Sequence, residues 1–341
     1  MEMNSTTRGA NNSDTNNRTA LGTATSAGDS TNLNDLSSFV NIMTLFVTPA
    51  VCGLGLIGNV ISLCVLLCTG LKKSSYVFLF ALTFSDSCWL LYALDASRLL
   101  FLYGSSLGWV GWEFPQEVAY GLFVMNHVIE FVANLGGYCS TTLPVAIMAE
   151  RCLAVFYPLK FHRLVTAKRA WIAVLCVCLF WLPWCLHSAF LYSFFYFRYR
   201  GVSFGLPYLS PYYIKNRKTI NLLDQYLFSS LASWVPVILV IAGAVVLGVK
   251  IKISHRKRQG LLSSTFAEPR VMTTRTTRTL VSVSVVFAVL YGYGLLTLLI
   301  KLKGIDAISD EILTQTRFLM VDINSSMNFV IYLMMNGKFR K

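Results

Sequence analysis

The strongest functional candidates in this chain are the few ionisable side chains that interrupt long apolar stretches. Glu150, Arg151 and Cys152 stand together at the end of one such stretch, and Asp86 and Asp322 each lie inside another. A charged group in an apolar helix is costly, so it usually pairs with another group or marks a binding or switching site. These residues are therefore the first place to look for function.

The patterns expected of an enzyme are missing from the sequence. We find no paired carboxylates, no nucleophile beside a base, and no metal-binding motif. The nine cysteines fall within or beside apolar runs, and none has the spacing of a zinc or redox site. We therefore expect a protein that is not an enzyme.

Composition narrows the class further. Of the 341 residues, 55% are hydrophobic and 13% are charged, about half of the roughly 25% charged residues in an average soluble domain. The net charge of +13 alone would suit a nucleic-acid binder, but so few charges would not cover the surface of soluble domains. The composition indicates a membrane protein and no nucleic-acid partner.

Seven long apolar stretches follow one another along the chain. They are Phe39–Cys68, Ser75–Leu94, Val118–Ala149, Ala170–Phe197, Gln225–Val249, Thr279–Ile300 and Phe318–Asn336. About 20 apolar residues cross a bilayer as a helix, and a helix satisfies its own backbone hydrogen bonds in lipid. We therefore predict an all-α membrane protein in which residues 39–336 form a seven-helix transmembrane bundle.

The two ends of the chain predict its orientation. Residues 1–38 are too polar to fold, and their three sequons, at Asn4, Asn11 and Asn17, favour a disordered, glycosylated extracellular tail. Of the 29 Lys and Arg residues, 18 lie in or beside the loops after stretches one, three and five or at the C-terminal end. This bias predicts a cytoplasmic C-terminus with residues 337–341 as a short cytoplasmic end, and a basic face suited to anionic membrane lipid.

Several motifs occur in the order found in one receptor family. They are Gly58-Asn59, Leu82 with Asp86, Glu150-Arg151-Cys152, Pro158-Leu159, Trp171, Pro236, and the run from Asn324 to Tyr332 in which Phe329 replaces a proline. Over about residues 40–341 the chain resembles the rhodopsin-like (class A) G-protein-coupled receptors. The resemblance implies a plasma-membrane receptor that couples an extracellular ligand to a heterotrimeric G protein. It also implies a short amphipathic helix behind the seventh span.

The resemblance assigns an activation switch to residues near the cytoplasmic side. These are Glu150, Arg151, Cys152, Tyr291, Asn328 and Tyr332. Arg151 would pair with Glu150 at rest and be released to contact the G protein, a role that suits a permanently charged guanidinium. The start of the sixth span offers no acid to hold Arg151, so we expect a weak resting lock and raised basal activity.

The same resemblance implies a polar network around Asp86. The side chains that would face its carboxylate are Ser140, Asn324, Ser325 and Asn328. Such oxygen ligands suit a hard cation, and the expected cation is sodium. The alternative is a protonated Asp86 within a hydrogen-bonded network, and no other cofactor is expected.

Other positions depart from the family pattern. Asn126 stands where the family has a cysteine at the outer end of the third helix, and the stretch Arg198–Asn221 has no cysteine, so the family's disulfide is not expected. The region of the third helix that carries an acid in amine receptors holds Ala133 and Asn134, and Asp322 stands at the position of the retinal-binding lysine of opsins. Neither ligand type is expected.

The remaining polar groups near the outer halves of the helices are candidates for a ligand pocket. They are Glu130, Asn134, Asp322, Arg317, Asp95 and Arg98. They would bind a charged small molecule or a peptide terminus, or else pair among themselves.

Three readings of the whole chain stay open. The Glu-Arg-Cys triplet, the Asn-Phe variant and the missing disulfide are similar to divergent invertebrate chemosensory receptors. A long aromatic and basic loop before the fifth span would also suit a neuropeptide receptor. A transporter would show internal repeats and broken helices at matching positions in two halves, and we find neither.

Overall fold

The computed structural model describes most of the apolar part of the chain. The described residues are 39, 42–94, 116–199, 202–228, 230–262, 285–294, 296–297, 300 and 307–335. The predictions for residues 1–38 and 337–341 lie outside them, as do those for Asn4, Asn11, Asn17, Asp95, Arg98 and the amphipathic helix behind the seventh span.

The chain divides into two compact units, Met1–Val47 and Thr48–Lys341. In the first unit the structure describes a short π-helical segment, η1 (Met43–Val47). All sites discussed below belong to the second unit.

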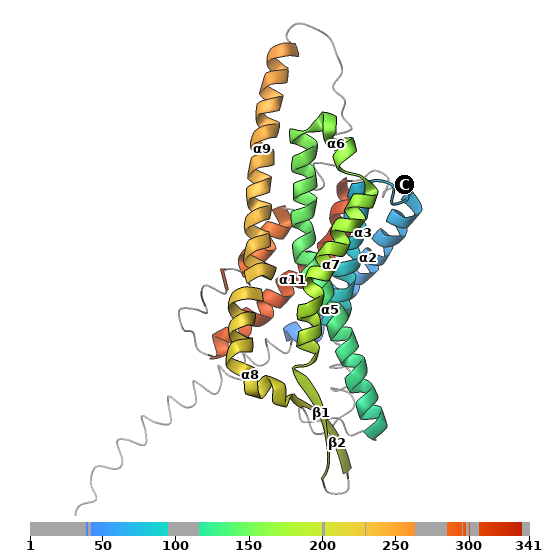
Figure 1. Ribbon diagram of the computed structural model, residues 1–341, viewed down its shortest axis with the longest axis vertical. Coiled ribbons are helices and arrows are strands. Elements are labelled where there is room, and N and C mark those ends of the chain that lie inside the picture. The colour runs from blue at the N-terminus through green and yellow to red at the C-terminus, as the bar shows by residue number, and fades with distance from the viewer. Residues whose placement is uncertain are drawn as a thin grey trace, which may run out of the picture. The chain divides into compact units, whose positions relative to one another are not determined.

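The second unit is a bundle of long helices (Figure 1). They are α2 (Thr48–Thr69), α3 (Ser74–Ala93), α5 (Gln116–Phe156), α7 (Ala167–Ala189), α9 (Val235–Leu262), the Val285–Gly294 helix and α11 (Ala307–Met335). Among the described residues, five helices are long and apolar enough to cross a membrane. The predicted helical membrane bundle is confirmed.

Local sequence signals set several helix ends. Gly70, with a φ of +83°, follows α2 and adopts the left-handed backbone that glycine allows after a helix. The hydroxyl of Thr166 accepts the Arg169 N–H and caps α7. A short helix, α6 (Pro158–Leu164), begins at a proline, where the missing N–H is not needed.

The fourth and fifth spans differ from their predicted limits. The fourth helix ends at Ala189, and the aromatic stretch after it forms a strand, β1 (Tyr192–Tyr199), which pairs antiparallel with β2 (Val202–Leu209). The predicted helix through Phe197 was therefore wrong, because a stretch rich in aromatic residues lacks charges as a span does and yet favours a strand.

The fifth span starts earlier than predicted. The hydroxyl of Ser210 caps α8 (Pro211–Leu222), with Pro211 in its first turn. Two π-helical segments, η3 (Leu223–Phe228) and η4 (Ser230–Trp234), join α8 to α9. Such π-helical turns interrupt the regular ladder and are frequent at functional sites.

Helix α5 is central to the packing. One hydrophobic cluster joins it to α2, α3 and α7 around Leu82, Leu143 and Val174. A second cluster joins it to α9 and the Val285–Gly294 helix around Met148, Val240 and Phe287. Helix α5 therefore contacts elements on several sides of the bundle.

Two glycines permit close helix contacts. A Cβ added at Gly136 of α5 would lie 2.7 Å from the backbone oxygen of Ser85 in α3. One added at Gly58 of α2 would lie 2.8 Å from the Cβ of Phe329 in α11. The Phe329 side chain thus packs where Gly58 leaves room.

This packing predicts opposite effects for two glycines of α2. We expect Gly58→Ala to destabilise the protein by about 1–3 kcal/mol through overpacking, because Phe329 occupies the space. A Cβ at Gly53 meets nothing within 4 Å, so Gly53→Ala should gain up to about 1 kcal/mol from helix propensity. Thermal unfolding of both variants in detergent measures the difference, and equal midpoints would contradict the contact.

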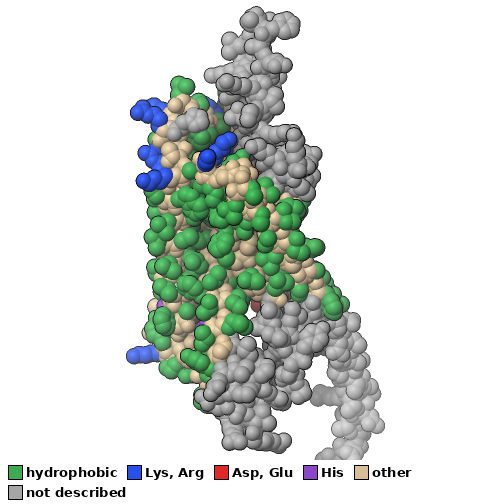
Figure 2. All heavy atoms as spheres, turned by 90° about the vertical axis from the view of Figure 1, so that its right-hand side faces the viewer, with side chains coloured by type: hydrophobic (Ala, Val, Ile, Leu, Met, Phe, Trp, Pro, Cys, Tyr) green, Lys and Arg blue, Asp and Glu red, His purple; other side chains and the backbone are tan. Residues whose placement is uncertain are grey.

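The surface matches a protein embedded in lipid. Large apolar side chains such as Leu54, 73% exposed, and Ile57, 61% exposed, face outward from α2. Hydrophobic side chains cover the flank visible in Figure 2, and Lys and Arg side chains gather at its upper end. A soluble protein would not expose so large an apolar surface.

Candidate functional site

A buried carboxyl group, that of Asp86 in α3, lies inside the bundle. It is fully buried, and its Oδ1 accepts a hydrogen bond from the Ser140 hydroxyl of α5 at 2.5 Å. Its Oδ2 accepts one from the Asn328 amide of α11. Three helices are thus joined by one carboxylate, as the predicted network requires.

Ser325 completes this network on the side of α11. It lies beside Asp86, and its buried hydroxyl has no hydrogen-bond partner within the described part of the chain. Its backbone oxygen accepts the amide of Asn59 from α2 at 3.1 Å. Asn324 is buried in the same helix, but no contact recorded for the described residues joins it to Asp86.

A second buried carboxylate, Asp322, is held separately. The indole N–H of Trp89 in α3 donates to its Oδ1 at 2.9 Å, and the Cys52 thiol of α2 also bonds to its side chain. Asp322 is 1% exposed. It therefore ties α11 to α2 and α3.

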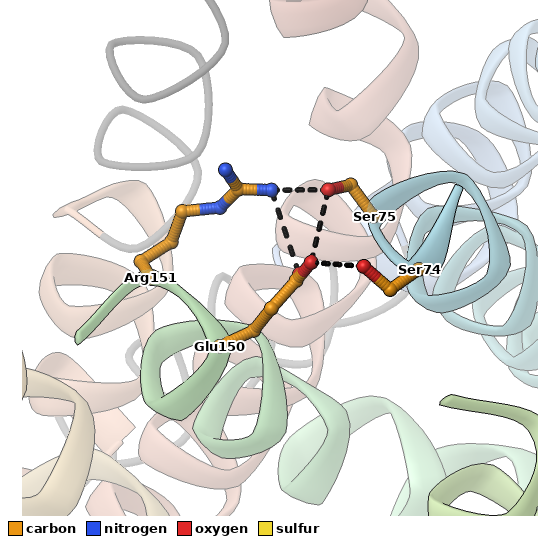
Figure 3. A network of polar contacts seen from close by, with 4 residues as sticks. All are labelled: Ser74, Ser75, Glu150 and Arg151. Atoms are coloured by element: carbon orange, nitrogen blue, oxygen red, sulfur yellow. Dashed lines mark hydrogen bonds and ion pairs between the residues drawn. The ribbon is translucent and has the colours of Figure 1, made fainter. Parts of the chain in front are cut away.

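Glu150 and Arg151 form a compact cluster with Ser74 and Ser75 between α5 and α3 (Figure 3). The Ser74 and Ser75 hydroxyls donate to Oε1 of Glu150 at 2.5 and 3.1 Å. Arg151 donates to the Ser75 hydroxyl and, at 3.4 Å, to Oε2 of Glu150. The carboxylate lies at the first turn of α3, where the helix dipole favours a negative charge.

Arg151 is buried in this cluster with one hydrogen-bond donor unsatisfied within the described part of the chain. Glu150 is 3% and Arg151 8% exposed, so both charges are largely removed from water. The Nε of Arg151 has no hydrogen-bond partner among the described residues. A buried guanidinium with an unsatisfied donor gains from any new acceptor that reaches it.

Sequence reasoning identified Glu150, Arg151 and Cys152 but missed Ser74 and Ser75. These serines follow Lys72-Lys73 and open α3. Serine at a helix start is a recognisable signal, but nothing in the sequence says that this start meets the end of α5. Cys152 packs against the second hydrophobic cluster instead.

A cavity of about 310 Å³ lies among the helices. The residues of α5 that line it, from Asn134 to Thr141, precede the Glu150–Arg151 cluster along the helix. Its polar lining includes Asn134, Ser140, Asp224, Ser233, Arg317 and Ser325, and its aromatic lining is Trp89, Tyr138, Tyr291 and Phe318. This size lies at the lower end of small-molecule pockets. Ser140 and Ser325 belong both to the cavity and to the surroundings of Asp86.

The predicted pocket residues are divided by the structure. Asn134 and Arg317 line the cavity, and Tyr291 joins them from the Val285–Gly294 helix. Glu130 and Asp322 are not among the lining residues. Tyr332 belongs to α11, but the position of its side chain is not among those described.

Glu130 lies instead beside the hairpin. Partial burial raises the pKa of Tyr192 in β1, and the nearby Glu130 carboxylate adds to the rise. The ring of Phe194 contacts those of Tyr120 and Phe123 in α5, at centroid distances of 5.7 and 5.3 Å. The hairpin is thus held to α5 by aromatic contacts, and all nine cysteines of the chain are free thiols.

Comparison with known proteins places the chain in a family. The model described as "Serpentine type 7TM GPCR chemoreceptor Srw" matches residues 46–341. The chain therefore belongs to the Srw family of serpentine seven-transmembrane chemoreceptors and is a multi-pass membrane protein. This is a family of receptors.

A relative from Caenorhabditis elegans, a probable G-protein coupled receptor, is 27% identical over 164 residues. The match covers 46% of this chain and 36% of the relative. The chain thus spans about a third of the length of the curated relative that it matches.

Proposed function

We propose that this protein is a plasma-membrane chemosensory receptor that couples an extracellular small molecule to a heterotrimeric G protein. The observation that carries the proposal is the layout of α5. This one helix lines the cavity with Asn134, holds Asp86 through Ser140, and ends in the Glu150–Arg151 cluster. Ligand and G protein would therefore act on the two ends of a single element.

The shared residues suggest how binding is transmitted. Ser140 and Ser325 line the cavity and also surround Asp86. A ligand that contacts them changes the hydrogen bonds between α5, α3 and α11. Coupling then requires only that the ligand bind one helix arrangement better than another.

The proposed orientation has the tail with Asn4, Asn11 and Asn17 outside the cell and glycosylated. The end of the bundle that carries α6 and the turn between α2 and α3 is basic, with Lys72, Lys73, Lys160 and Arg163. Its Lys and Arg side chains gather at the top of Figure 2. Such an end favours the cytoplasm and anionic lipid headgroups.

Sodium fits the site around Asp86. The carboxylate and the hydroxyls of Ser140 and Ser325 offer hard oxygen ligands. The Ser325 hydroxyl lies beside the Asp86 carboxylate and makes no hydrogen bond of standard geometry within the described residues, so it is free to turn toward such an ion. Bound there, sodium would neutralise the Asp86 charge and hold α3, α5 and α11 together.

The function is tested by nucleotide exchange on purified heterotrimeric G proteins. Membranes that contain the receptor should accelerate GTP binding by at least one G-protein class over membranes without it. If the receptor is present in the membranes and GTP binding is accelerated for no G-protein class, the proposal is rejected.

The Ser75 contact predicts a gain of activity. In Ser75→Ala, both Arg151 and Glu150 lose a hydrogen-bond partner, so we expect ligand-independent GTP exchange to rise about three- to tenfold. A hydrogen bond to a charged group is worth about 1.5–3 kcal/mol. Its loss destabilises the resting state, in which Arg151 is held, relative to the state in which Arg151 is released. Ser87→Ala is the control, because that hydroxyl bonds within its own helix to Thr83. An unchanged basal rate in Ser75→Ala would exclude Ser75 from the resting lock.

A further inference from the structure

Two opposite charges line the cavity from different elements. Arg317 comes from α11 and Asp224 from the π-helical segment η3. No ion pair within 4.0 Å joins them in the described part of the chain. Arg317 is partly buried and Asp224 is exposed, so both side chains of this cavity of about 310 Å³ are accessible to a ligand of opposite charge.

Neither charge is satisfied elsewhere among the described residues. The guanidinium of Arg317 lies 5.3 Å from the centroid of the Phe318 ring and is attracted by Asp310 of the same helix, but no hydrogen bond or ion pair of this guanidinium is recorded there. The Asp224 carboxylate likewise has no recorded hydrogen bond or ion pair. As far as the described residues go, both groups have hydrogen-bonding capacity left for a ligand.

The backbone around Asp224 is irregular on the side of the cavity. Segments η3 and η4 carry Asp224, Ala232 and Ser233 into the lining. A π-helical turn shifts the residues after it around the helix axis, and it persists mainly where the shifted side chains have a use. The irregularity is a second observation, independent of the charges, that points to this wall.

The aromatic walls are fixed from behind. The Tyr138 ring stacks on Trp181 with centroids 4.6 Å apart, and Trp181 in turn donates to the Thr142 hydroxyl at 3.0 Å. Trp89 is anchored by its hydrogen bond to Asp322. Rigid aromatic surfaces lower the entropy cost of binding a flat apolar group.

We propose that the cavity binds a small zwitterion of the amino-acid class. The ligand carboxylate pairs with Arg317, its ammonium group pairs with Asp224, and an aromatic side group packs against Trp89 and Tyr138. A simple amine would leave Arg317 unpaired, and a simple acid would leave Asp224 unpaired, so each would lose one charge-assisted hydrogen bond that the zwitterion makes. This inference rests on the proposed function for the cavity's role as a receptor pocket.

The test measures binding without any G protein. Thermal unfolding of the full, detergent-solubilised chain is followed with phenylalanine, tyrosine and tryptophan. Each is compared with its decarboxylated amine and with its deaminated acid. We expect at least one amino acid to raise the unfolding midpoint, and its amine and acid to bind about tenfold or more weakly. If no amino acid stabilises the chain, or if an amine or acid matches its parent, the proposal is overturned.

Two variants assign the ends of the ligand. Arg317→Gln should weaken binding of the amino acid to the level of the amine, and Asp224→Asn should weaken it to the level of the acid. Arg317→Lys retains the charge and should restore most of the binding if Arg317→Gln unfolds. Lys215→Gln in α8, an exposed position, is the control for loss of a positive charge. Equal affinity in the wild type and in Arg317→Lys, Arg317→Gln and Asp224→Asn would assign the ligand elsewhere.

The two proposals fail in different ways. Zwitterion binding that persists while GTP exchange is never accelerated would reject the G-protein coupling alone. Accelerated GTP exchange without stabilisation by any of the three amino acids would reject the ligand class alone.

Discussion

Replacing Arg151 by Ala should reduce G-protein activation by about ten- to a hundredfold, with the receptor still present at the cell surface. The guanidinium of Arg151 is buried beside Glu150 and Ser75 and keeps one unsatisfied donor. A charged donor that meets an acceptor on the G protein contributes about 1.5–3 kcal/mol to the complex. Ligand-driven GTP exchange in cell membranes measures the loss.

Two further variants separate the role of Arg151 from general charge loss. Lys168→Ala removes an exposed positive charge at the start of α7 and should leave activation near the wild-type level. Arg151→Lys keeps the charge without the planar set of donors and should fall between the two. If Arg151→Ala signals as well as the wild type, this residue has no part in coupling.

The second large effect is expected at Asp86. The Asp86→Asn substitution removes the only negative charge among the side chains that form this network in the described structure, Asp86, Ser140, Ser325 and Asn328. A sodium ion held by these oxygens would lose most of its binding energy. We expect the effect of sodium on receptor activity to disappear, with the polar contacts between α3, α5 and α11 largely retained.

The measurement compares GTP exchange in sodium chloride and in N-methylglucamine chloride at equal ionic strength. Glu130→Gln is the control, because this carboxylate lies beside Tyr192 and not beside Asp86. A sodium effect of the same size in the wild type and in Asp86→Asn would remove the cation from this site.

The sequence predicted the bundle well because apolar length is a direct consequence of the bilayer. It predicted the ends of helices less well. The predicted fourth span continued through Phe197 because Tyr192–Tyr199 is rich in aromatic residues, but aromatic residues also favour strands. The fifth helix begins at Pro211, in a polar stretch that a hydropathy criterion assigns to a loop.

The sequence predicted those parts of the candidate site that contain recognisable motifs. The resemblance placed Ser140 and Asn328 near Asp86, and the structure brings both to its carboxylate. Asp224 was missed because the predicted fifth span began one residue later, at Gln225. Contacts between distant chain segments, such as Ser74 with Glu150, leave no local signal and require the three-dimensional packing.

The attachment of the hairpin has a consequence for handling the receptor. Its ring contacts with α5 are edge-on and tilted, each worth about 0.5–1.5 kcal/mol, and no disulfide takes part, since all the cysteines are free. The attachment of the hairpin to α5 is therefore insensitive to thiol reagents. It is sensitive to compounds that compete for the aromatic side chains. A purification in strong reductant would leave the hairpin in place, whereas an aromatic detergent or additive would loosen it.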